Sequence, residues 1–128
     1  MSEQLDEFAA LLRRAVDDAA AEFGGDALVL TDERQACDPL PSARAFVWAY
    51  QVALPMAANA HATLTETVAP RLAAQGWQAT VRDTDREFAV HFGRNGFDIG
   101  VLIGRADRAD IVIGGSTPAI ALLPSPAE

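Results

Sequence analysis

The stretch EFAVHFGRNGFDIGVLIG, residues 87–104, decides the fold of this chain. Apolar residues alternate with small or polar residues on both sides of Asn95-Gly96, and this dipeptide is the strongest short signal for a two-residue hairpin turn. The pattern predicts two antiparallel strands in which His91 faces Gly100 and lies diagonal to Asp98. A four-residue loop would instead place His91 directly opposite Asp98.

The segments on either side of this hairpin extend it to a four-strand meander. A turn with Thr84 and Asp85 at its tip is predicted before it, and a turn at 106–108 after it. The first turn gives three cross-strand pairs, namely Asp83 with Arg86, Arg82 with Glu87, and Val81 with Phe88. One face of the meander is expected to lie under the helices; its residues are Trp77, Ala79, Val81, Phe88, Val90, Phe92, Phe97, Ile99, Val101, Ile103, Ile111 and Ile113.

The first half of the chain predicts two helices and two strands. Apolar residues recur three and four positions apart in the helical segments and every second position in the strands. The first helix is expected to begin after Ser2 as its N-cap and to end at Gly24-Gly25. The other expected elements are a strand over 27–31, a polar loop over 32–42, a strand over 46–54 that ends at Pro55, and a helix over 56–75 that Pro70 kinks. On the first helix, Arg13 with Asp17 and Arg14 with Asp18 are spaced as pairs one turn apart.

The predicted fold class is therefore α+β. It has a largely antiparallel sheet of about six strands with two helices, in the order α-β-β-α-β-β-β-β. A chain of 128 residues fits one domain over 1–128, and the proline-rich end, 119–128, is expected to be a loose tail.

Charge and cysteine content narrow the class of protein. The net charge is −8, with 18 acidic and 10 basic residues, which disfavours nucleic acid as a partner. No apolar run approaches the length of a membrane span, and the first residues lack the pattern of a signal peptide. A single cysteine, Cys37, cannot form an intramolecular disulfide. We therefore expect a cytoplasmic protein with no membrane contact.

Candidate ligand-binding residues are the large aromatic side chains beside the second helix. Trp48, Tyr50 and Trp77 could line a cleft with His61 at its rim, although large aromatics on a core-facing stripe are more often the core itself. His61 lacks further ligands at helical spacing for a metal site. The composition and spacing therefore predict no metal, no cofactor and no catalytic residue.

Other polar motifs have a structural explanation. His91 beside Asp98 has the composition of a general base, but hydrophobic-in, polar-out alternation predicts polar residues there without any site. Cys37 lacks cationic neighbours that would lower its pKa. The segment 114–117, Gly-Gly-Ser-Thr, leads into Pro118 rather than a helix, which favours a strand end over a phosphate-binding loop.

The sheet face opposite the core has few charges for an exposed surface. Either the first helix covers it from the opposite side, or another chain does. The candidate interface residues are Val47, Ala49, Ala53, Ala89, His91, Leu102 and Val112.

Four short motifs resemble a loose group of small actinobacterial proteins, many of them lipoproteins or exported proteins of unknown function. The matching residues are Trp48-Ala49-Tyr50, Gly76-Trp77, Gly96-Phe97 and Ser116-Thr117-Pro118. The group closes on a Ser/Thr-Pro-Cys sequence, whereas position 119 is alanine here; the resemblance thus implies a lost disulfide partner for Cys37. It supports the fold and implies no mechanism.

The function expected from these features is protein binding without catalysis. The partner is a second copy, giving a homodimer, or another protein, and the acidity suits an immunity-like or chaperone-like role toward a basic protein. The alternative is a binder of small apolar ligands, or a minor enzyme, that uses the aromatic cleft.

Overall fold

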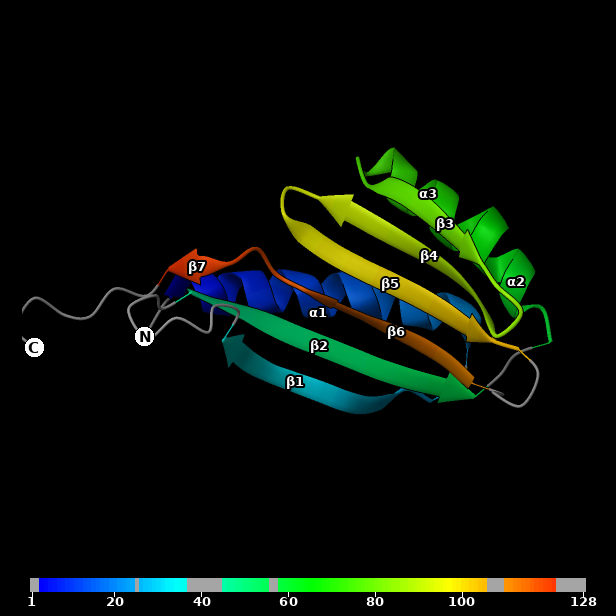
Figure 1. The fold of residues 1–128 in the computed structure, drawn as a ribbon, viewed down its shortest axis with the longest axis horizontal. Coiled ribbons are helices and arrows are strands. Elements are labelled where there is room, and N and C mark those ends of the chain that lie inside the picture. Colours follow the sequence, from blue (N-terminus) through cyan, green and yellow to red (C-terminus); the bar gives the residue numbers. More distant parts are fainter. Residues whose placement is uncertain (1–2, 25, 37–44, 56–57, 106–109, 122–128) are drawn as a thin grey trace, which may run out of the picture.

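The computed structural model describes residues 3–24, 26–36, 45–55, 58–105 and 110–121, and it confirms the α+β fold and the predicted element order (Figure 1). The strands form one antiparallel sheet in the order β1-β2-β6-β5-β4-β3, and β7 pairs with β2. The elements are α1 (Glu3–Phe23), β1 (Leu28–Ala36), β2 (Ala45–Pro55), α2 (Ala60–Thr63), the π-helical turn η1 (Leu64–Val68), α3 (Ala69–Ala74), β3 (Gln78–Asp83), β4 (Glu87–Arg94), β5 (Phe97–Gly104), β6 (Asp110–Ser116) and β7 (Ile120–Ala121).

The first helix matches its prediction because one apolar stripe runs along its whole length. Its buried residues are Leu5, Ala9, Leu12, Val16, Ala19, Ala20 and Phe23, which recur at the spacing of one helical face. Gly24 follows the helix with φ of +72°, a left-handed conformation that glycine adopts without steric cost.

Strand β1 is longer than predicted, because it continues through Ala36 into the segment expected to be a loop. Residues 32–35 are polar and Ala36 follows them, yet each of these five pairs with a residue of the long strand β2. Backbone pairing with an available neighbour overrides weak local propensity. The polar side chains remain exposed at the sheet edge, where charge also discourages pairing between molecules.

The second helical segment is divided into three parts just before Pro70, where the sequence predicts a kink. α2, η1 and α3 follow one another without a break, and η1 ends directly before Ala69-Pro70. Proline has no N–H group to donate and its ring crowds the carbonyl four residues earlier, so the wider π-helical turn accommodates it. The described helix begins at Ala60, later than predicted, while residues 56–57 lie outside the described part.

Of the two described hairpins, one has the predicted register and the other does not. The Asn95-Gly96 turn is confirmed, with His91 paired to Gly100. At the preceding turn the register is displaced by two residues, so Val81 pairs with Val90 and Asp83 with Phe88. A displacement of two residues leaves every side chain on its predicted face. The predicted turn at 106–108 lies outside the described residues.

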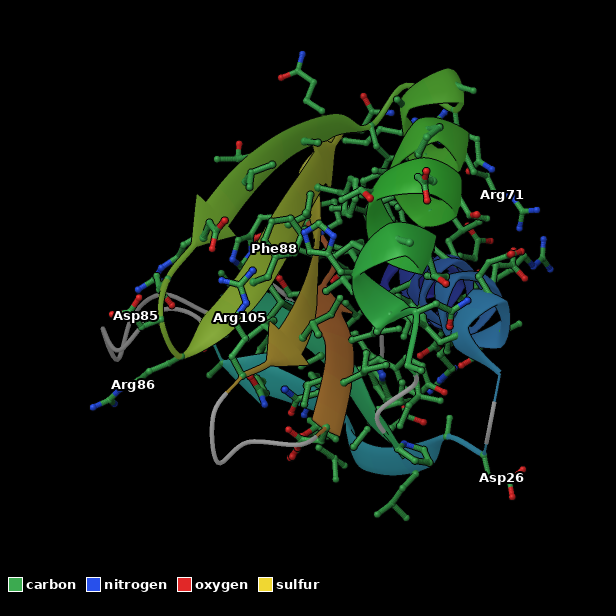
Figure 2. The ribbon with its side chains drawn as sticks, turned by 90° about the vertical axis from the view of Figure 1, so that its right-hand side faces the viewer. Asp26, Arg71, Asp85, Arg86, Phe88 and Arg105 are labelled. Atoms are coloured by element: carbon green, nitrogen blue, oxygen red, sulfur yellow. The ribbon has the colours of Figure 1, made fainter. Side chains whose placement is uncertain are left out.

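Both helical segments lie on the same side of the sheet (Figure 2), so the idea that the first helix covers the opposite face is wrong. Between sheet and helices lies one core, which includes Leu12, Val16, Tyr50, Val52, Leu64, Val68, Phe88, Phe92, Ile99, Val101, Ile111 and Ile113. Ala79 and Val81 were expected in this core but are exposed, Val81 to 60%, because the edge strand β3 extends beyond the helical layer.

Two residues of the segment expected to be a loose tail belong to the sheet. Ile120 and Ala121, in the predicted loose tail, form β7 and pair with Phe46 and Ala45 at the start of β2. Residues 122–128 lie outside the described part.

Candidate functional site

The sheet face away from the helices, which we call the outer face, has an apolar row across five strands. The strand registers align these residues as direct cross-strand neighbours, in the order Leu28, Ala53, Val112, Leu102 and Ala89. Directly paired side chains on one face have Cβ atoms about 5 Å apart, so the row is continuous. At its far end Ala89 pairs with Arg82 on β3.

The apolar row lies open along most of its length. Leu28 at the sheet edge is 66% exposed, and Ala53, Leu102 and Val112 are half-buried. Ala89 is fully buried, and its cross-strand neighbours Arg82 and Leu102 both have longer side chains than its methyl group. The row is thus a shallow apolar surface between taller side chains.

Acidic side chains surround the apolar row. Alternation along the strands places four carboxylates on the outer face, those of Glu33, Glu87, Asp98 and Asp110. Among the strand positions described on this face, one carries a guanidinium, Arg82. The outer face therefore combines apolar contact surface with a negative potential.

A hollow of about 410 Å³ lies beside the row in the middle of the outer face. Gly100 and Gly114 pair with each other in its floor. A Cβ atom on Gly100 would lie 3.1 Å from Nδ1 of His91, and one on Gly114 would lie 2.8 Å from Cγ of Gln51. The absence of side chains here lets His91 and Gln51 lie flat across the strands.

The imidazole of His91 makes no hydrogen bond or ion pair with Asp98 or with any other residue that the structure describes. The paired register places it opposite Gly100 and leaves Asp98 on the diagonal. An exposed imidazole without a carboxylate partner lacks the group that would orient it as a general base, and the hydrogen-bond geometry therefore gives no support to catalysis at His91.

Two of the predicted ligand-binding aromatics are held by carboxylates, one on α1 and one on β1. The phenol of Tyr50 donates to Asp17 at 2.7 Å, and the indole N–H of Trp48 donates to Asp32 at 2.6 Å. Arg13 pairs with Asp32 at 3.0 Å and lies 5.1 Å from the centre of the Trp48 ring. Burial, with a further contribution from Asp17, raises the pKa of Tyr50 to about 12.

The remaining two candidates lie elsewhere. The His61 ring packs 4.3 Å from the Phe88 ring. Arg105 contacts the same phenyl ring, with its guanidinium 5.5 Å from the ring centre, and Figure 2 shows Phe88 and Arg105 as neighbours. Trp77 is buried and lines a groove against α1 in which Trp48, Tyr50 and His61 take no part. The structure therefore does not assemble the predicted aromatic cleft.

The segment 114–117 ends a strand rather than binding phosphate. Its glycines belong to β6, and Thr117 beyond them is buried. The Thr117 hydroxyl accepts from the backbone N–H of Trp48 at 2.9 Å, and the Thr117 N–H donates to the Trp48 carbonyl at 3.0 Å. Thr117 thus fastens the end of β6 to β2.

The described residues show neither a metal-binding cluster nor a membrane-spanning helix. These residues contain no group of three or more His, Cys, Asp or Glu that could hold a metal ion. None of their helices combines the length and the apolar character that crossing a membrane requires. Cys37, for which the resemblance implies a lost disulfide partner, lies outside the described residues.

Comparison with known proteins gives a likeness of fold. No family model and no curated protein sequence matches the chain. The crystal structure of the putative lipoprotein LppA from Mycobacterium tuberculosis is similar, with a TM-score of 0.56 and 15% identity, over 94% of this chain and 80% of LppA. At this identity the likeness shows the fold, and it agrees in source with the actinobacterial resemblance of the short motifs.

The same likeness corrects our expectation of location. A cytoplasmic protein was predicted from the absence of a signal-peptide pattern and from the single cysteine. The chain instead shares its fold with a protein described as a putative lipoprotein, and we withdraw the cytoplasmic assignment.

Several residues that organise these surfaces gave no signal in the sequence. The sequence predicts a loop at Asp32 and an ion pair between Asp17 and Arg13. Both carboxylates instead accept hydrogen bonds from aromatic residues of β2. Arg105 joins β5 to the preceding hairpin through Asp83 and the carbonyl of Thr84. Each of these contacts joins segments distant in sequence, for which local spacing gives no information.

Proposed function

We propose that the outer face of this domain binds a basic, amphipathic segment of a protein partner and performs no catalysis. The observation that carries the proposal is the continuous apolar row from Leu28 to Ala89 among outer-face carboxylates. Apolar contact supplies affinity, while complementary charge raises the rate of encounter and rejects wrong partners. This is an immunity-like or chaperone-like role toward a basic protein.

Charge favours a different protein over a second copy of this chain. In a symmetric dimer the same patch meets itself, so a surface that carries Asp98 and Asp110 would face a second surface carrying the same carboxylates. The chain as a whole carries a net charge of −8, and like charges facing one another at an interface are unfavourable. A partner segment with lysine or arginine beside leucine satisfies both parts of the surface.

The test uses a model peptide of leucine and lysine in an amphipathic pattern, with a leucine and glutamate peptide of the same pattern as its control. Binding is followed by titration calorimetry, and the bound surface is mapped by amide chemical shifts. We expect the basic peptide alone to bind, with shifts concentrated on β2, β4, β5 and β6. Equal binding of both peptides, or shifts concentrated on the helices, would contradict the proposal.

A matched pair of variants locates the contact. Leu102→Arg puts a positive charge in the apolar row and is expected to lower the affinity for the basic peptide by about tenfold or more. Leu11→Arg makes the same change at a half-exposed leucine of α1, on the helical side, and should leave affinity unchanged. Light scattering of the unmodified protein provides a further check, since a dimer that Leu102→Arg dissociates would assign the face to a second copy instead.

A further inference from the structure

A second concave surface lies on the helical side of the molecule, away from the outer face. This groove of about 360 Å³ is formed by α1, the residues that follow α3, and the turn between β4 and β5. We call it the Trp77 groove; its lining residues are Leu11, Arg14, Ala15, Asp18, Gln75, Trp77, Arg94, Asn95 and Phe97. Its volume lies at the lower end of the range for small-molecule sites.

One side of the Trp77 groove is apolar and aromatic. Leu11 is an apolar side chain that is 51% exposed. Trp77 is only 8% exposed. Phe97 is held in place by an edge-on contact with Phe8, with ring centres 5.2 Å apart. These side chains offer a rigid surface for a flat or aliphatic body.

The indole N–H of Trp77 is an unused donor. It makes no hydrogen bond with the described residues, and within the same residues no buried side-chain nitrogen or oxygen lacks a partner. The N–H group is therefore in contact with solvent, and the Trp77 side chain is also part of the groove lining.

Two guanidinium groups of the groove have no anionic partner among the residues that the structure describes. Arg14 comes from α1 and Arg94 from the end of β4, and neither forms an ion pair with another described residue. The pair expected between Arg14 and Asp18, one helical turn apart, is not formed. With Asp18 also on the wall, the groove carries two positive charges and one negative charge in a protein whose net charge is −8.

We propose that the Trp77 groove binds a small amphiphilic anion, with its carboxylate or similar group on Arg14 and Arg94 and its apolar body against Trp77 and Phe97. Arginine binds carboxylates in a planar, two-pronged geometry. This site is independent of the protein-binding outer face. The ligand is a free molecule rather than a lipid in a bilayer, because a protein with this net charge is repelled by an anionic membrane surface.

The experiment compares two fluorescent probes that differ in charge. Anilinonaphthalene sulfonate carries an aromatic body and an anionic group, and N-phenyl-naphthylamine has a similar body without charge. We expect the anionic probe to bind at least about tenfold more tightly. It should also shift the indole N–H resonance of Trp77 and not that of Trp48, the two resonances being assigned with Trp48→Phe. Equal affinity of the two probes would overturn the proposal.

Charge variants test the role of each group. Arg14→Gln and Arg94→Gln should each lower the affinity for the anionic probe by about fivefold to tenfold without changing the affinity for the neutral probe. Asp18→Asn should raise the affinity for the anionic probe. Arg82→Gln, on the outer face, is the matched control and should have no effect. Far-ultraviolet circular dichroism and the urea midpoint confirm that each variant is folded, and folded arginine variants with unchanged affinity would refute the assignment.

Two further arms separate the sources of binding. Decanoate should displace the anionic probe, and phosphatidylglycerol vesicles should not co-sediment the protein; vesicle binding without displacement by decanoate would assign the groove to a lipid surface. Leu102→Arg should leave probe binding intact, so that failure of the outer-face proposal and failure of this one are distinguished.

Discussion

The phenol of Tyr50, on β2, donates a hydrogen bond of 2.7 Å to the carboxylate of Asp17, on α1. This contact joins the helical layer to the sheet at a position where the tyrosine ring is almost fully buried. Burial and the nearby carboxylate both oppose formation of a phenolate, and they raise the pKa of Tyr50 from 10.0 to about 12.

The raised pKa predicts a loss of stability at alkaline pH. Because the folded pKa lies above the unfolded one, the contribution of neutral Tyr50 is complete below pH 10 and is lost as the pH rises through 12. The chain has one tyrosine and no lysine, so few other groups titrate in this range. Ultraviolet absorbance of the phenolate should show a single delayed titration in the folded protein, and urea unfolding should show stability decreasing between pH 10 and 12.

Tyr50→Phe is the control for this alkaline effect. It removes the hydroxyl and should cost about 1 kcal/mol below pH 10, while abolishing the steeper loss of stability above it. A phenolate that titrates at the ordinary pKa in the folded protein would show that the Asp17 contact is not maintained in solution.

The sheet was predictable because alternation reports which way each side chain points. At the hairpin near Thr84 the register differs from the predicted one by two residues, so each side chain still lies on its predicted face of the sheet. Residues 32–36 show the limit of this reasoning. Their polar composition indicates a loop, and they become a strand because β2 offers backbone partners along its whole length.

The surfaces were predictable to different degrees. Alternation alone placed the interface candidates, from Val47 to Val112, on one face. The Trp77 groove draws Arg14 and Arg94 from elements far apart in sequence, which no local spacing brings together. Ion pairs one turn apart on a helix are worth about 0.5 kcal/mol or less, and Arg13 accordingly binds Asp32 on β1 instead of Asp17.

His91 is predicted to contribute little to stability. Its ring is exposed and lies over Gly100 without a polar partner among the described residues. His91→Ala should therefore change the free energy of unfolding by no more than about 0.5 kcal/mol. Chemical denaturation at neutral pH measures this, and a loss of several times that size would mean that the imidazole fills a closed position on the outer face.

Thr117 is predicted to stabilise the junction between β6 and β2 through its hydroxyl. Thr117→Val keeps the size of the side chain but leaves the backbone N–H of Trp48 without its acceptor, which should cost about 1 to 3 kcal/mol because unpaired buried donors are penalised. Thr117→Ser retains the hydroxyl and should lose clearly less. If serine and valine destabilise equally, the methyl group and not the hydrogen bond is what matters at this position.

Gly115 is predicted to be the least replaceable glycine in the sheet. A Cβ atom there would lie 1.9 Å from the backbone oxygen of Asp98, and a backbone atom of a paired strand cannot move aside without breaking the ladder between β5 and β6. Gly115→Ala should therefore cost more than about 2 kcal/mol. Gly100→Ala, where the nearest atom belongs to the exposed His91 side chain at 3.1 Å, should cost much less because that ring can rotate away. Thermal unfolding of the two variants side by side tests this difference, and a Gly115→Ala protein as stable as the Gly100→Ala protein would show that the two strands do not approach so closely at Asp98.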